Sequence, residues 1–242
     1  MNIKLLIEYD GTAFSGWQRQ PHARTVQGDL EKALSDLLME DIRVDGSSRT
    51  DSGVHAREYP VSFRTNGRIP PERIALAVNA KLPDDIRALS SMEMPEGFHA
   101  RYSSDGKTYS YRMLRRSLPS AIYRNYACLV EESIDFEKMK ASAELFRGSH
   151  DFRGFMSTGS SDMNTVKEIR EMNLSEEGNF IILTITASGF LYNMARIIAG
   201  TLIDAGMGKI GEPEILSILE SGVRGRSKPA PPSGLYLEKV YY

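Results

Sequence analysis

The chain has 242 residues, with 30 Lys and Arg against 32 Asp and Glu, and a formal net charge of −2. Hydrophobic residues make up 41% and charged residues 26% of it, which is ordinary globular usage and excludes collagen-like, coiled-coil and disordered classes. The single cysteine, Cys128, excludes a disulfide framework and a four-thiolate zinc site, and the four scattered histidines argue against a histidine-rich metal centre.

The N-terminal half predicts the element order β-α-β-β-α-β. A strand over 3–9 ends at the turn pair Asp10-Gly11, and Thr25 is a suitable N-cap for a helix whose apolar residues recur at helical spacing. The remaining elements are expected as strands at 42–47 and 59–64, a helix that opens at Pro70-Pro71, and a strand at 86–93.

The C-terminal half repeats this order with one added helix. The expected strands are 107–114, 165–174, 179–188 and 235–241, and the expected helices are one capped by Ser133, an apolar one at 190–205 and a short one at 213–220. We predict an α+β fold of two ferredoxin-like β-α-β-β-α-β halves, residues 1–104 and 105–242, with merged antiparallel sheets and a central cleft. Chance recurrence of short strands is the alternative.

The sequence also argues against a membrane or exported protein. There is no apolar run of the roughly 18 residues that a membrane helix needs. The first residues, Met1-Asn2-Ile3-Lys4, lack the basic and then apolar order of a signal peptide. We therefore expect a soluble, cytoplasmic protein with no membrane partner.

The segment Arg49-Thr50-Asp51-Ser52-Gly53 is the first candidate for chemistry. An arginine two residues from an aspartate can keep the carboxylate ionised by charge pairing. An ionised Asp51 on a tight loop is suited to nucleophilic or general-base work. The alternative is a plain turn with a surface pair between Arg49 and Asp51, and this segment alone favours that alternative.

The second candidate is Lys107-Thr108-Tyr109-Ser110-Tyr111-Arg112, in a stretch rich in basic residues. Tyr109 and Tyr111 fall on one face of the expected strand. Exposed aromatic rings among basic residues can stack on bases and meet phosphates. The alternative, two packed tyrosines beside a solvated charged edge, has equal weight.

Two further segments carry isolated polar groups. Arg19 and Arg24 precede the first helix and can grip a phosphate backbone, although an ordinary connecting loop explains them equally. Asn193 and Arg196 interrupt an apolar run; a buried arginine needs a partner, and Asp51 is the attractive candidate. The alternative is that Arg196 extends to the surface.

These segments occur together in a recognisable order. They are Glu8 to Thr12, Gly16-Trp17-Gln18, Thr25-Val26-Gln27, Arg49 to Ala56, Asn79 to Ile86, Phe98 to Arg101, Lys107 to Tyr111, His150 to Phe152 with Phe155, Gly189 to Arg196, and Ala230 to Leu237. Over nearly its whole length the chain resembles the tRNA pseudouridine synthase A family.

The resemblance implies a pseudouridine synthase fold and isomerisation of uridine to pseudouridine at positions 38, 39 and 40 in the anticodon stem-loop of tRNA. It implies a reaction with no cofactor and no metal, and a homodimer that holds the tRNA anticodon arm. By similarity Asp51 is the catalytic nucleophile, Tyr109 stacks on the target base, Arg49 and Arg196 flank Asp51, and Leu235 packs near the base.

The chain departs from the family pattern at two places near Asp51. Ser48 replaces the usual glycine before the arginine, and Arg57-Glu58-Tyr59-Pro60 replaces a Gly-Gln-Val-like run. Two rival functions remain at this point: an RNA-binding protein without catalysis, and an enzyme acting on another substrate with Asp51 and His55 as an acid–base pair.

Overall fold

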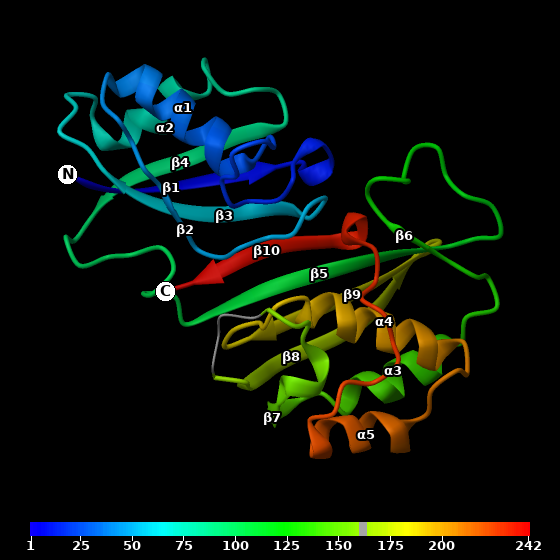
Figure 1. Cartoon of the computed structure of the whole chain (residues 1–242). Helices are drawn as coiled ribbons and strands as arrows, with labels where there is room; N and C mark the ends of the chain where they lie inside the picture. Colours follow the sequence, from blue (N-terminus) through cyan, green and yellow to red (C-terminus); the bar gives the residue numbers. More distant parts are fainter. Residues whose placement is uncertain (160–163) are drawn as a thin grey trace. The chain divides into compact units, whose positions relative to one another are not determined.

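The computed structural model describes residues 1–159 and 164–242 (Figure 1). By their contacts these residues form two units, Met1–Asp105 with Tyr236–Tyr242, and Gly106–Leu235. Both combine sheets and helices, so the fold is α+β. Among the described residues, none of the helices has both the length and the apolarity needed to cross a bilayer.

The first unit has the ferredoxin-like element order that the sequence predicts. Its strands pair in the order β4-β1-β3, with β2 on the other side of β3, and the pairs β1–β3, β1–β4 and β2–β3 are antiparallel. Its elements are β1 (Asn2–Tyr9), α1 (Val26–Leu38), β2 (Asp45–Gly46), β3 (His55–Arg64), α2 (Ile74–Val78), β4 (Ile86–Met94) and β10 (Leu235–Tyr241).

Alternation along β1 determines which face of this sheet packs against α1 and α2 (Figure 1). Ile3, Leu5 and Ile7 are fully buried, whereas Lys4 and Leu6 between them are partly exposed. This period of two is what a strand with one covered face requires.

The last strand, β10, pairs in parallel with β3 through Tyr236 opposite His55 and Leu237 opposite Ala56. Beyond β10, the Tyr242 hydroxyl donates a hydrogen bond to the Ala100 carbonyl at 2.7 Å. These contacts group residues 236–242 with the first unit, although the sequence analysis assigned them to the second half.

The second unit contains the antiparallel order β5-β9-β8-β7, with β6 parallel to β5. Helices α3 and α4 contact each other, and α3 also contacts β8. Its elements are β5 (Gly106–Arg115), β6 (Cys128–Val130), α3 (Phe136–Glu144), β7 (Gly148–Asp151), β8 (Val166–Glu177), β9 (Phe180–Ala187), α4 (Met194–Gly206) and α5 (Glu212–Ser221).

Two predicted helix starts were wrong. Asp135, not Ser133, caps α3, and its side chain accepts a hydrogen bond from the Lys138 amide at 3.0 Å. The helix predicted from residue 190 begins at Met194, because Asn193 has a left-handed backbone with φ 62° that interrupts helical geometry.

Candidate active-site residues

Asp51 lies half-buried on the loop that joins β2 to β3. The Val54 amide donates to the Asp51 carbonyl at 3.2 Å, which closes a tight turn. Gly53 within this turn has φ +78°, a conformation that favours glycine. The turn therefore presents the Asp51 side chain on a backbone of defined shape.

The segment just after β1 supports this loop from behind. The Trp17 amide donates to the Thr50 carbonyl at 3.1 Å, and the Ser52 hydroxyl donates to the Phe14 carbonyl at 3.1 Å. Gly16 has φ +87°, and a Cβ there would lie 2.7 Å from the Thr50 oxygen. Only a glycine allows the two segments to approach this closely.

A buried tyrosine supports the beginning of the same loop. The Tyr59 hydroxyl donates to the Ser48 carbonyl and accepts from the Ser48 amide, while its ring stacks on Trp17 with centroids 4.3 Å apart. From the sequence, Tyr59 was expected to begin a strand and to depart from the family pattern, and its support of the loop was not predicted. Ser48 is absent from the positive-φ residues of the described chain, so serine fits there without left-handed strain.

His55 is buried and has a structural role through its Nδ1 atom. Nδ1 accepts a hydrogen bond from the Gly11 amide at 3.0 Å and lies 3.1 Å from an Asp10 carboxylate oxygen. The ring also stacks on Tyr236 with centroids 4.7 Å apart. The Nδ1 lone pair accepts the hydrogen bond from Gly11, so this nitrogen is not available as a base. This weighs against an enzyme that uses Asp51 and His55 as an acid–base pair.

The charge pair expected between Arg49 and Asp51 is not formed. The Arg49 side chain is exposed, and across residues 1–159 and 164–242 it makes no ion pair. Its guanidinium donors therefore face solvent.

Arg24, expected to be available for phosphate, is instead bound within the first unit. Its guanidinium makes two hydrogen bonds to Asp85, at 2.7 and 2.8 Å, and a third to Asp29 at 2.9 Å. These hydrogen bonds raise the pKa of Arg24. The group also lies over the Phe14 ring, 4.3 Å from its centroid. Arg24 thus links Asp29, in the first turn of α1, to Asp85, which directly precedes β4.

In the second unit, Tyr109 lies on β5 opposite Ile185 of β9. Tyr109 is only 6% exposed, which favours the packed alternative over the exposed ring. The Phe190 ring packs edge to face against the Tyr109 ring, with the two centroids 4.8 Å apart. Phe190 is a contact that the sequence analysis missed, because the strand pattern gives no information on a residue 81 positions away.

Tyr111, two residues further along the same strand, is a packing residue. It is 1% exposed, its hydroxyl donates to the Pro231 carbonyl at 2.8 Å, and burial raises its pKa. A Cβ on Gly234 would lie 2.8 Å from both the Tyr111 ring and the Arg112 carbonyl. These contacts determine the path of the backbone into β10, which begins at Leu235. Leu235 is 6% exposed.

Arg196 is partly buried in the first turn of α4. Its Nε donates to the Ala230 carbonyl and its Nη1 to the Asn193 side-chain oxygen, both at 2.8 Å. A Cβ on Gly200, one turn later, would lie 2.1 Å from the Lys228 carbonyl, so the 228–230 segment runs directly against the helix. Arg196 therefore does not extend freely to the surface; its guanidinium has a fixed position.

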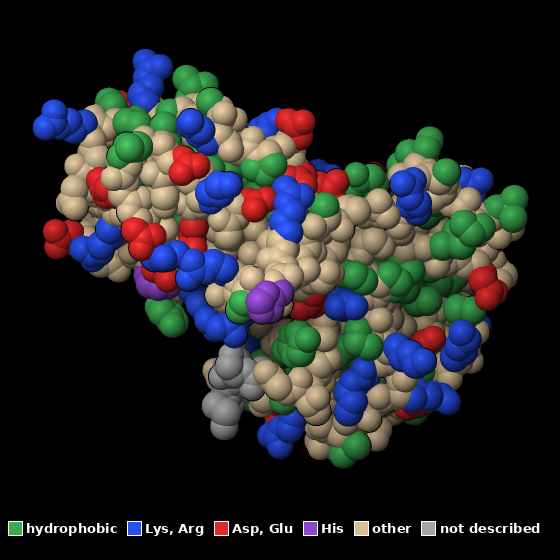
Figure 2. Space-filling view, turned by 45° about the horizontal axis from the view of Figure 1, so that its top comes forward, with side chains coloured by type: hydrophobic (Ala, Val, Ile, Leu, Met, Phe, Trp, Pro, Cys, Tyr) green, Lys and Arg blue, Asp and Glu red, His purple; other side chains and the backbone are tan. Residues whose placement is uncertain are grey.

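The surface charges are mixed. Figure 2 shows Lys and Arg distributed over the visible face with Asp and Glu between them, in agreement with the net charge of −2. Among the residues that the structure describes, no group of three or more His, Cys, Asp or Glu could hold a metal ion.

Comparison with known proteins identifies the family. The model of the family described as tRNA pseudouridine synthase matches residues 5–103 and 142–242. The chain belongs to this family, and its fold is that of a pseudouridine synthase.

Its relatives include proteins named tRNA pseudouridine synthase A. It is 49% identical to one of Clostridium botulinum (strain Eklund 17B / Type B), and 42% identical to one of Thermoanaerobacter sp. (strain X514). It is 46% identical to tRNA pseudouridine synthase A 2 of Clostridium perfringens. Each comparison covers 100% of this chain and 99% of the relative.

Replacing Tyr59 by phenylalanine tests the support of the Asp51 loop. Tyr59→Phe removes the hydroxyl that pairs with both backbone groups of Ser48, so we expect a loss of about 1–3 kcal/mol in the free energy of unfolding. Faster amide hydrogen exchange at Ser48 should accompany it. Tyr123→Phe is the control, because Tyr123 is 41% exposed. Equal effects of the two substitutions would contradict the role of Tyr59.

Proposed function

We propose that this protein is an isomerase that converts uridine to pseudouridine at positions 38, 39 and 40 in the anticodon stem-loop of tRNA. One observation carries the proposal: Asp51 lies on a tight, well-supported loop in a chain that aligns end to end with tRNA pseudouridine synthases A. A carboxylate of fixed position is the group that the reaction needs.

The reaction breaks the bond between C1′ of the ribose and N1 of uracil, turns the base, and joins C1′ to C5. C5 loses a proton and N1 gains one, so the atoms balance and no oxidant, reductant or cofactor is required. The target base must first leave its stack, at a cost of a few kcal/mol. Asp51 serves as the carboxylate that attacks C1′ or C6, or that takes a ribose proton.

Residues of both units are assigned to the substrate in this proposal. Tyr109 stacks on the extruded uracil, and its edge-to-face contact with Phe190 supports this role by fixing the ring plane. Leu235 packs near the same base. Arg196, whose guanidinium is oriented by Ala230 and Asn193, is assigned to the substrate as well.

Arg49 has a different assignment, because its side chain is exposed and makes no ion pair within the described residues. We assign it to a phosphate of the tRNA backbone, where a guanidinium can bind two oxygens at once.

We also propose that the protein works in the cytoplasm as a homodimer that holds the anticodon arm. A symmetric dimer is the commonest assembly of soluble proteins. Sedimentation of the free protein at micromolar concentration should give twice the chain mass of 27.1 kDa. A species of 27.1 kDa under these conditions would contradict the dimer.

Replacing Asp51 by asparagine tests the central assignment. Asp51→Asn removes the carboxylate with little change in shape, so isomerisation of unmodified tRNA should stop while tRNA binding persists. Tritium release from C5-labelled uridine in single-turnover reactions measures the first, and filter binding measures the second. Substantial turnover by the variant would exclude Asp51 as the catalytic group; an inactive wild-type protein that still binds tRNA would favour the RNA-binding alternative.

Tyr109 is tested by two substitutions compared with each other. If the ring stacks on uracil, Tyr109→Leu should slow turnover more than Tyr109→Phe, by about 1–3 kcal/mol or roughly one to two powers of ten. If the hydroxyl takes the C5 proton, both should fail equally, by about two to four powers of ten. Normal turnover in Tyr109→Leu would remove this residue from the site.

A further inference from the structure

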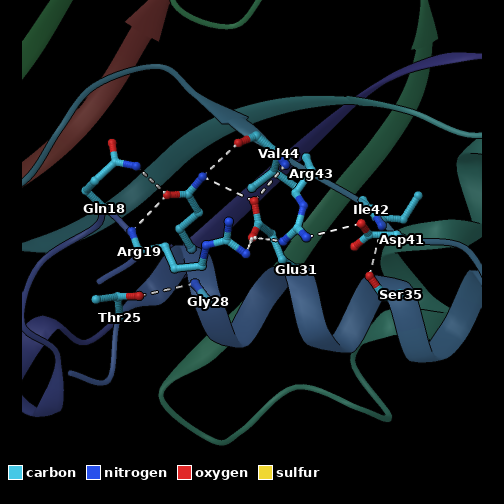
Figure 3. A network of polar contacts seen from close by, with 11 residues as sticks. Gln18, Arg19, Thr25, Gly28, Glu31, Ser35, Asp41, Ile42, Arg43 and Val44 are labelled. Atoms are coloured by element: carbon cyan, nitrogen blue, oxygen red, sulfur yellow. Dashed lines mark hydrogen bonds and ion pairs between the residues drawn. The ribbon is translucent and has the colours of Figure 1, made fainter. Parts of the chain in front are cut away.

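A network of polar contacts joins α1 to the 18–19 and 41–44 segments of the first unit (Figure 3). Its centre is Glu31 on α1, which is 4% exposed. A buried carboxylate is costly unless several donors surround it. The donors around Glu31 therefore indicate the role of this buried carboxylate.

Four donors surround the Glu31 carboxylate. The Val44 amide and the Gln27 side-chain amide each lie 3.2 Å from Oε1. Arg19 and Arg43 each place a guanidinium nitrogen 3.3 Å from Oε2. Figure 3 shows these groups converging on the one side chain from the 18–19 segment, from α1 and from the 41–44 segment.

Gln27 lies one helical turn before Glu31, and both the oxygen and the nitrogen of its side-chain amide make hydrogen bonds. Its oxygen accepts from the Arg19 backbone amide at 2.9 Å and from the Gln18 side chain at 3.0 Å. Its nitrogen donates to the Val44 carbonyl at 3.1 Å as well as to Glu31. Its backbone amide donates to the Trp17 carbonyl at 3.0 Å.

Both ends of this network lead to the Asp51 loop. Trp17, bound to Gln27 through its carbonyl, donates its own amide to the Thr50 carbonyl beside Asp51. Val44, bound to both side chains, is followed directly by β2, where the loop begins. The side chains of Gln27 and Glu31 thus bind the Arg19 and Val44 backbones, which adjoin the two segments that lead to the loop.

We propose that Gln27 and Glu31 are positioning residues for Asp51: their paired side chains hold the Arg19 and Val44 backbones, and through the adjoining segments the Asp51 carboxylate, in the geometry needed for the chemical step. This inference rests on the proposed function. Neither Gln27 nor Glu31 contacts Asp51. A substitution of either residue should therefore lower the rate of the chemical step and leave the affinity for tRNA unchanged. A displacement of about 1 Å by a distant mutation can cost about a hundredfold in rate.

The test uses the full chain and unmodified tRNA, with three variants. Glu31→Gln removes the carboxylate that Arg19 and Arg43 share. Gln27→Glu places a second carboxylate against Glu31 and removes the donor to Val44. The double variant restores one carboxylate and one amide in contact. Asp36→Asn is the matched control, because Asp36 is an exposed residue on the same helix.

Each single substitution should lower the single-turnover rate about tenfold to a hundredfold at saturating protein, with the dissociation constant for tRNA unchanged. The double variant should be faster than either single one, and Asp36→Asn should match the wild type. Thermal unfolding in the assay buffer gives the folded fraction by which each rate is corrected.

Three results would overturn the inference. The corrected rates of the single variants could equal the wild-type rate, or weaker tRNA binding could account for the loss. The third is a double variant whose fold-loss in rate equals the product of the two single fold-losses. An inactive wild-type protein would contradict the proposed function itself, and the inference with it. The wild-type reaction in the same series separates these two failures.

Discussion

The close backbone approach between the segment after β1 and the Asp51 loop is the constraint on which the rest of the first unit depends. A Cβ on Gly11 would lie 2.0 Å from the Val54 carbonyl, and one on Gly16 would lie 2.7 Å from the Thr50 carbonyl. No other residue type fits at either place without moving main chain. The loop therefore rests on backbone atoms, which have fewer alternative positions than side chains.

Both units position their candidate residues by hydrogen bonds to main-chain groups. Tyr59 binds Ser48 in the first unit, and Arg196 binds the Ala230 carbonyl in the second. Such contacts fix orientation and suit a reaction in which a base must be received, turned and rejoined at one carbon. They also explain why the chain tolerates serine before Arg49, since the shape of the loop depends on the segment behind it.

The periodicity of apolar residues predicted most strands and helices, because period two and period 3.6 follow directly from burial of one face. Arg49 and Asp51, two residues apart, form no ion pair in the described part of the chain, since sequence neighbours need not contact each other. Arg24 binds Asp85, 61 positions away, and Tyr111 binds Pro231, 120 positions away. Spacing along the chain carries no information on such partners, so neither the availability of Arg24 nor the choice between an exposed and a packed Tyr109 could be predicted.

The support of the loop is most directly tested by amide hydrogen exchange in the free protein. We predict that the amides of Trp17 and Val54, which donate to the Thr50 and Asp51 carbonyls, exchange as slowly as those of the paired strands β1 and β3. Exchange of both amides at the rate of an unprotected peptide would contradict it, because the Asp51 loop would then move independently of the segment behind it.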